Sequence, residues 1–255
     1  MDLFATGATR RELLGSLALG TTSAPLLRQH LSPMRALAFD AFVLFDPTPI
    51  VERAKILVGE KGGALFATAS TKLFSYTWLY TSGGRYDGFE ALARDAFRSA
   101  ADVHGAMLKV SEVDSLVATY SMLPLWPDVT AAILRLRERN LRLAVLANLP
   151  KRWLVSNLRA NRIEGHFEHV LSTDEVRRFK PAPEAYAMAM DKVRLSARSI
   201  GFAASAGWDA SGAVWFGYRT AWVNRNNSPR EPAHASPDIV SRGMDGVLRL
   251  AAVDG

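Results

Sequence analysis

The sequence predicts an α/β fold, in which helices cover a parallel sheet and a helical segment is inserted after the first strand. Two observations predict this fold class. From Arg35 onward, short runs of β-forming residues alternate with longer segments of helical periodicity, which is typical of right-handed βαβ units. Residues 49–129 interrupt this alternation, because Ala, Leu and aromatic residues recur there at spacings of three and four.

The composition is that of a globular protein, with 49% hydrophobic and 22% charged residues in a chain of 255. No apolar run reaches about 18 residues, which argues against a polytopic membrane protein. The absence of cysteine excludes thiolate catalysis, disulfides and cysteine-bearing metal sites. The net charge is +6, but Lys and Arg are scattered, so we expect a small-molecule substrate and no nucleic-acid partner.

Residues 1–34 differ from the rest of the chain. Arg10 and Arg11 precede a stretch of small and apolar residues that runs to Leu27. This order resembles a twin-arginine export signal, and the stretch is too short to span a bilayer comfortably. Export would place the protein in the periplasm, with no stable membrane association after processing. The alternative is an amphipathic leader on a cytoplasmic protein, because residues 23–25 are a weak cleavage signal.

The elements of the sheet region follow in chain order. The predicted strands are 36–39, 142–146, 169–171, 200–204 and 220–223, and the predicted helices are 151–161, 183–192 and 209–216. Pro124 and Pro127 mark the return from the insertion, since two prolines so close prevent a continuous helix. Residues 226–237, rich in Asn, Ser and Pro, are predicted to form a loop. The expected divisions are a leader (1–34), a core (35–48 and 125–255) and a helical cap (49–124).

Asp40 follows directly after the first predicted strand. In an open parallel sheet, ligands bind outside the carboxyl ends of the strands. Lys180 comes after the third strand and Asp209 from the turn after the fourth, so all three side chains are expected to meet over one sheet edge. The alternative is that Lys180 and Asp209 form an ordinary ion pair, because such pairs also occur without catalysis.

Six sequence motifs occur in one order between residues 35 and 225. They are Phe39-Asp40-Ala41-Phe42-Val43-Leu44-Phe45-Asp46, Tyr76-Thr77-Trp78-Leu79, Gly84-Arg85-Tyr86, Phe167-Glu168-His169-Val170-Leu171-Ser172, Lys180-Pro181 and Gly207-Trp208-Asp209-Ala210. Together they resemble the haloacid dehalogenase superfamily, and most closely its type II 2-haloacid dehalogenase branch. The resemblance implies a Rossmann-like core with a helical cap, a small halogenated carboxylic acid or a related apolar analogue as substrate, and a possible homodimer.

The resemblance also implies hydrolysis by a covalent route. Asp40 would attack the halogen-bearing carbon, expel halide and form an aspartyl ester that water then cleaves, without any metal or other cofactor. Lys180 would favour the ionised form of Asp40, and Asp209 would fix Lys180 or help the hydrolytic water. The remaining residues implied to bind substrate are Phe42, Asn148, Tyr186, Ser205 and Trp208.

The phosphatase branch of the same superfamily has a second aspartate two residues after the nucleophile, where this chain has Phe42. A positioned acid usually contributes a factor of about 100 or more, so its loss disfavours phosphoryl transfer. Asp46 is too far along the loop to replace that acid, and we expect it to cap the segment that follows.

Five positions depart from the pattern of the dehalogenase branch. Ser70 stands six residues before Tyr76, where the branch has a cap-helix arginine that is thought to hold the halide and the carboxylate. Lys72 is the nearest cation, but two residues turn it to the opposite face of a helix. The other departures are Val43, Ala147, Ala204 and Ala206, each in place of polar residues.

Each missing donor could lower turnover by a factor of about 100. Three interpretations therefore stay open. The chain is a haloacid dehalogenase of weak or shifted specificity, a hydrolase of the same nucleophilic type for a more apolar substrate, or a catalytically degraded protein kept for binding.

Two further features have simple interpretations. Trp78 is expected to pack in the core, whereas Trp208, next to Asp209, is the better candidate for lining a halide pocket. His166 and His169 flank Glu168, but without a third ligand this spacing does not define a zinc site.

Overall fold

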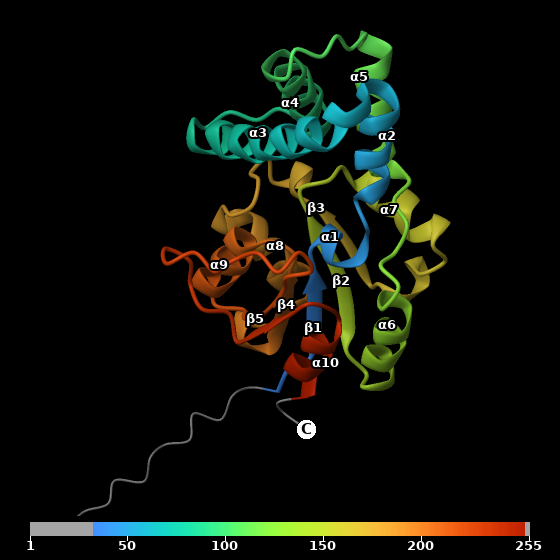
Figure 1. The fold of residues 1–255 in the computed structure, drawn as a ribbon. Coiled ribbons are helices and arrows are strands. Elements are labelled where there is room, and N and C mark those ends of the chain that lie inside the picture. Colours follow the sequence, from blue (N-terminus) through green and yellow to red (C-terminus); the bar gives the residue numbers. More distant parts are fainter. Residues whose placement is uncertain (1–32, 253–255) are drawn as a thin grey trace, which may run out of the picture. The chain divides into compact units, whose positions relative to one another are not determined.

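The computed structural model describes residues 33–252, and these form one compact unit (Figure 1). The predicted export signal lies outside the described residues, so the leader and the periplasmic location stay predictions, as does the homodimer. The boundary between cap and core also stays a prediction. Within the described residues, no helix has both the length and the apolar character needed to cross a membrane.

The described strands form a six-stranded sheet in the order β3-β2-β1-β4-β5-β6, in which every neighbouring pair is parallel. The predicted parallel α/β fold is confirmed. The strands are β1 (Ala36–Phe39), β2 (Arg142–Ala147), β3 (His169–Ser172), β4 (Ile200–Ala204), β5 (Arg219–Val223) and β6 (Ile239–Ser241).

The helices between β1 and β2 belong mainly to the predicted insertion. They are α1 (Ala41–Leu44), α2 (Thr48–Val58), α3 (Gly62–Ser82), α4 (Phe89–Val103), α5 (Val110–Ala118) and α6 (Val129–Glu138), with short 3-10 turns η1 (Gly59–Lys61) and η2 (Thr119–Ser121). We call Thr48–Ser121 the helical insertion. Gly62 lets α2 and α3 approach closely, because a Cβ there would lie 2.4 Å from the backbone nitrogen of Lys55.

The remaining helices alternate with the later strands. They are α7 (Lys151–Ala160), α8 (Pro183–Val193), α9 (Gly207–Phe216) and α10 (Asp245–Ala252), with 3-10 turns η3 (Glu164–His166), η4 (Thr173–Glu175) and η5 (Ala197–Ser199). The predicted loop at 226–237 contains neither helix nor strand. Four elements were not predicted from the sequence, namely α1, α6, β6 and α10; β6 has three residues, too few to show a strand pattern.

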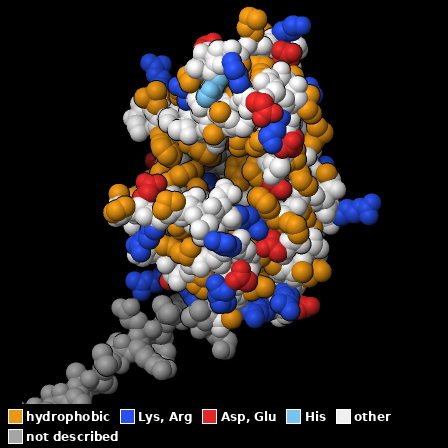
Figure 2. All heavy atoms as spheres, viewed as in Figure 1, with side chains coloured by type: hydrophobic (Ala, Val, Ile, Leu, Met, Phe, Trp, Pro, Cys, Tyr) orange, Lys and Arg blue, Asp and Glu red, His pale blue; other side chains and the backbone are white. Residues whose placement is uncertain are grey.

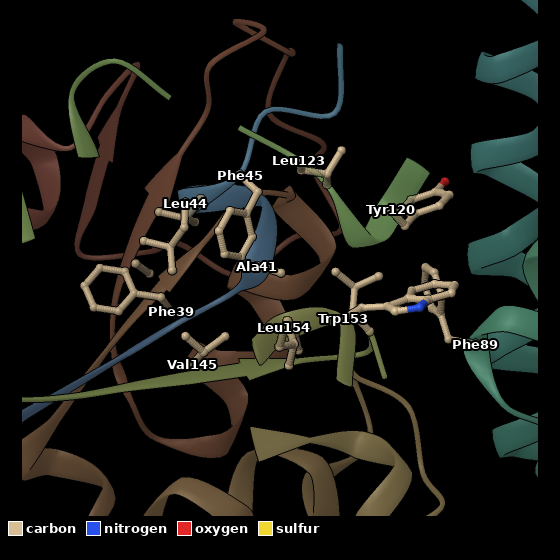
Figure 3. Packing of buried hydrophobic residues seen from close by; sticks show 14 of the residues in the cluster. Phe39, Ala41, Leu44, Phe45, Phe89, Tyr120, Leu123, Val145, Trp153 and Leu154 are labelled. Carbon is tan, nitrogen blue, oxygen red and sulfur yellow. The ribbon is translucent and has the colours of Figure 1, made fainter. Parts of the chain in front are cut away.

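Both faces of the sheet are buried, as expected for parallel strands covered by helices. Leu37 and Phe39 of β1 belong to one apolar cluster, whereas Ala36 and Ala38 belong to another. Successive side chains of a strand point to opposite faces, which explains this division. Figure 3 shows the first cluster near Phe39, with Val145 close by.

The chain passes between the sheet and the helical insertion twice, once after β1 and once before α6. These two crossings lie side by side. Phe45 and Leu125 form an antiparallel bridge, and the backbone nitrogen of Trp126 donates to the Leu44 carbonyl at 3.0 Å. The buried Asn157 of α7 supports the second crossing, because its amide donates to the Tyr120 carbonyl at 2.9 Å. The insertion is therefore tied to the carboxyl end of β1.

Candidate active site

Asp40 lies immediately after β1, at the carboxyl end of a strand that has neighbours on both sides. It is the N-cap of α1, and its Oδ2 accepts the backbone N–H of Phe42 at 3.0 Å. The Ser205 hydroxyl donates to the same oxygen at 2.7 Å. The residue is 6% exposed, so its carboxylate is fixed in a largely dry setting.

Lys180 joins the two candidate carboxylates. Its Nζ lies 2.7 Å from Oδ1 of Asp40 and 2.8 Å from Oδ2 of Asp209, and the residue is 1% exposed. Burial alone would lower the pKa of Lys180, but the charges of Asp209 and Asp40 outweigh it and raise the pKa above its usual value. The ammonium therefore stays charged between the two acids.

Asp209 lies in the first turn of α9, which begins two residues earlier than predicted. Burial raises the pKa of this carboxyl to about 6, although Lys180 works in the opposite direction. The Tyr186 hydroxyl donates to Oδ1 of Asp209 at 2.7 Å. Burial and the neighbouring Asp209 raise the pKa of Tyr186, which keeps its hydroxyl a donor.

Asn148 positions the loop that carries Lys180. Its Oδ1 accepts the backbone N–H of Lys180 at 3.0 Å and lies 3.3 Å from the Thr173 hydroxyl. Its Nδ2 is buried and has no hydrogen-bond partner among the described residues. One end of this amide thus holds the lysine loop, and the other end is an unused donor beside Asp40.

The helical insertion also contacts the lysine loop. The Thr81 hydroxyl, near the end of α3, accepts the backbone N–H of Phe179 at 3.2 Å, and the Thr81 carbonyl accepts from Arg178 at 3.1 Å. The Tyr86 ring is stacked on Phe179 with ring centres 5.0 Å apart. The residue before Lys180 is therefore held from the insertion side.

Two adjoining cavities open over these groups. A small one of about 20 Å³ is lined by Asp40, Asn148 and Lys180, among others, and has room for about one water-sized group. A larger one of about 480 Å³ is lined by residues of the insertion and of the loops after β4 and β5. The face drawn in Figure 2 is hollowed, with hydrophobic side chains around the hollow. The lining residues common to both cavities are Phe42, Phe74, Phe89, Ser205, Ala206 and Trp208.

The structure brings Asp40, Lys180 and Asp209 together in one hydrogen-bonded row. Of the residues expected to bind substrate, all but one line a cavity; they are Phe42, Asn148, Ser205 and Trp208. Tyr186 is not among the lining residues of either cavity. Its hydroxyl donates to Asp209, and a contact of Tyr186 with substrate stays a prediction.

Three of the five substituted positions line a cavity and two do not. Ser70 lines the larger cavity, whereas Lys72 lines neither, as its place on the helix predicts. Ala147 and Ala206 also line a cavity, and both offer only a methyl group. Val43 and Ala204 are fully buried.

Trp78 corrects one expectation. It is 37% exposed rather than packed in the core, and it meets Trp208 edge to face at 5.5 Å between ring centres. The Trp78 ring is therefore partly open to solvent and packs against Trp208.

The loop after β5 contributes residues to the larger cavity that were not predicted from the sequence. Arg225, Glu231 and His234 line the larger cavity. Arg225 lies two residues after the end of β5, and this place near the carboxyl end of a strand is the signal that the sequence offers for it. The Arg225 guanidinium donates to both oxygens of Asp128, at 2.8 and 3.2 Å, and lies over the Trp126 ring.

No group of three or more His, Cys, Asp or Glu side chains suited to a metal ion occurs within residues 33–252. Asp46 accepts the backbone N–H of Thr48 at 2.9 Å, and this is the capping contact expected of it. The charged groups over the sheet edge are thus two carboxylates bridged by one ammonium.

Comparison with known proteins gives one consistent result. A family model described as haloacid dehalogenase-like hydrolase matches residues 34–217. Haloacetate dehalogenase H-2 of Moraxella sp. (strain B) is 31% identical over 221 residues, which cover 86% of this chain and 99% of that protein. The (S)-2-haloacid dehalogenase of Pseudomonas sp. (strain YL) is 29% identical over 218 residues, covering 85% and 94%. A crystal structure of an L-2-haloacid dehalogenase matches with a TM-score of 0.84 and 32% identity, covering 87% of this chain and all of that one.

Proposed function

The chain belongs to the haloacid dehalogenase-like hydrolase family, and we propose that it is a hydrolytic dehalogenase of halogenated carboxylic acids with Asp40 as its nucleophile. One observation carries the proposal. The Asp40 carboxylate lines a cavity while Lys180 holds one of its oxygens and Ser205 the other. A carboxylate is a weak nucleophile, so a site that uses it has to keep it ionised and aimed.

In the first step, a carboxylate oxygen of Asp40 attacks the carbon that bears the halogen. The new C–O bond forms as the carbon–halogen bond breaks, and the halide leaves with the bonding electron pair. The product is an ester between Asp40 and the substrate carbon. Trp208 borders both cavities and offers an aromatic edge to the weakly hydrated halide.

In the second step, water adds to the ester carbonyl carbon of Asp40. The hydroxy acid leaves, the carboxylate is restored, and one proton is released for each halide. Lys180 remains next to the carboxylate in both steps and offsets its returning charge. Asp209 fixes the ammonium by accepting its hydrogen bond, and Tyr186 fixes Asp209 by donating to its other oxygen.

The rival interpretation is a protein that has kept the fold and lost turnover. The replaced donors favour it, since Ser70 and Ala147 line the cavities where the dehalogenase branch offers arginine and serine. A phosphatase is a weaker candidate, because Phe42 occupies the position of the required acid. Magnesium-dependent hydrolysis of p-nitrophenyl phosphate is the measurement that would favour it.

The test is halide release from monobromoacetate and (S)-2-chloropropionate. We expect the unaltered protein to release halide and Asp40→Asn to release none above background. Asp102→Asn is the matched control, since Asp102 is an exposed carboxylate of α4 that lines neither cavity. If the unaltered protein and Asp40→Asn release equal halide across a panel of haloacids, the dehalogenase proposal fails and the rival gains.

A single turnover in water enriched in heavy oxygen tests the covalent route separately. The proposed ester is cleaved at the Asp40 carbonyl, so one heavy oxygen atom is expected in the peptide that contains Asp40. Label found only in the product hydroxy acid would mean that water attacks the substrate directly.

A further inference from the structure

The larger cavity has aromatic walls on several sides. Phe66 and Phe74 come from α3, Phe89 from α4 and Tyr120 from η2, while Trp208 and Trp222 come from α9 and β5. Aromatic side chains offer large, rigid apolar surfaces, and ring pairs gain further from edge and offset contacts. The walls are therefore suited to an apolar group on a ligand.

One face of α3 forms the roof of this cavity. Phe66, Ser70, Leu73 and Phe74 line it, at the spacings of three and four residues that share a helix face. Ser70 is the polar member of this group. An arginine at its place would fill space and add a charge, so the serine leaves the cavity both wider and less polar.

The charged lining residues provide little free positive charge. Arg225 is paired with Asp128 through its two terminal nitrogens. These hydrogen bonds lower the pKa of Asp128, although burial works in the opposite direction. Glu231 is exposed and lies 3.6 Å from Nε2 of His234. A substrate carboxylate next to Asp40 would find a donor in Nδ2 of Asn148, which has no partner among the described residues. The other unpartnered buried nitrogens of the lining, Nε of Arg225 and Nδ1 of His234, belong to the larger cavity.

We propose that this site takes 2-haloacids with a large apolar group on the halogen-bearing carbon, and that haloacetate is a poor substrate. The inference rests on the proposed dehalogenase function. The reacting carbon and its carboxylate lie next to Asp40 and Asn148, and the apolar group extends along the apolar lining residues of α3, α4 and η2. The cavity of about 480 Å³ falls in the range of roughly 300–1000 Å³ that holds drug-sized ligands, far more than a haloacetate occupies.

The test is the dependence of kcat/KM on chain length. Halide release is measured for bromoacetate and for 2-bromopropanoate, 2-bromobutanoate and 2-bromohexanoate. Transfer of one methylene from water to an apolar site changes an equilibrium by about fourfold, so the rise from propanoate to hexanoate is expected to be on the order of 50-fold. The three substituted acids have similar intrinsic reactivity, so the comparison reports the cavity.

A cavity-filling variant tests whether the dependence of kcat/KM on chain length arises in the larger cavity. Ser70→Phe is expected to lower kcat/KM for 2-bromohexanoate at least about tenfold more than for 2-bromopropanoate, because the new ring takes the space of the alkyl group. Ser75→Phe is the matched control, since Ser75 is exposed on α3 and lines neither cavity. The control is expected to keep the chain-length dependence of the unaltered protein.

Two failures can be told apart. If every acid gives no halide above Asp40→Asn, the proposed function is overturned and this inference with it. If short acids are hydrolysed as well as long ones, or if Ser70→Phe affects both equally, dehalogenation stands and the inference about the apolar group is overturned.

Discussion

Lys180 shows how two acids can be kept at one buried position. Two carboxylates that close to each other repel, and burial penalises the charged form of each. The Lys180 ammonium lies 2.7 and 2.8 Å from them and offsets part of that repulsion. The row still carries one excess negative charge, and the pKa of Asp209 rises to about 6 in response to burial and to Asp40.

The raised pKa of Asp209 gives a prediction about stability and pH. A raised folded-state pKa contributes stability that is full below 3.8 and is lost as the pH rises through about 6. The free energy of unfolding of the wild type, relative to Asp209→Asn, is expected to fall by about 2 to 3 kcal/mol between pH 4 and pH 7. Urea denaturation at several pH values measures it.

Asp102→Asn serves as the control, because Asp102 is exposed. The free energy of unfolding of Asp102→Asn is expected to differ from that of the wild type by a nearly constant amount over the same pH range. If the free energy of unfolding of Asp209→Asn also differed from that of the wild type by a constant amount, the pKa of the Asp209 carboxyl would not be raised.

Ser70 gives a second prediction at the same scale. Ser70→Arg, with or without Ala147→Ser, is expected to raise kcat/KM for bromoacetate by about 10-fold or more, because a hydrogen bond to a charged group contributes about 1.5–3 kcal/mol. Ser75→Arg adds the same charge to the exposed face of α3 and is expected to have little effect. Unchanged or lower turnover in folded Ser70→Arg would argue against Ser70 as the site of the lost anion contact.

At the scale of elements, the link between α3 and the lysine loop is the most informative contact. The Thr81 hydroxyl accepts the N–H of the buried Phe179, one residue before Lys180. Thr81→Val is expected to lower the free energy of unfolding by about 1–3 kcal/mol, because the Phe179 N–H loses its partner.

Thr71→Val is the matched control for that change, since the Thr71 hydroxyl is exposed and donates to a carbonyl of its own helix. It is expected to change the free energy of unfolding by less than about 0.5 kcal/mol. Equal losses in the two variants would mean that the contact of Thr81 with the lysine loop adds nothing.

The elements also show what sequence patterns can predict. The five longer strands were predicted because each is a short run of β-forming residues between longer segments of helical periodicity. The edge strand β6 is short and half exposed, so no hydrophobic pattern marks it. The helix α10 has only eight residues, too short for its periodicity to be separated from the loop before it.

At the scale of the whole described chain, the row of Asp40, Lys180 and Asp209 follows from topology. Each residue lies near the carboxyl end of a parallel strand, and such ends converge at one sheet edge. The roles of Tyr186, Trp78 and Arg225 do not follow from topology. They depend on which neighbour each side chain meets, and those neighbours are distant in sequence, such as Asp209 for Tyr186 and Asp128 for Arg225.

The paired chain crossings at Phe45 and Leu125 have a consequence for the evolution of such proteins. Because entry and exit are adjacent, everything between them can be exchanged for a different set of helices while the sheet keeps its register. The roof of the binding space would then change, whereas Asp40, Lys180 and Asp209 all lie outside the exchanged segment. A replacement set of helices would also have to supply the contact that Thr81 of α3 makes with the loop before Lys180.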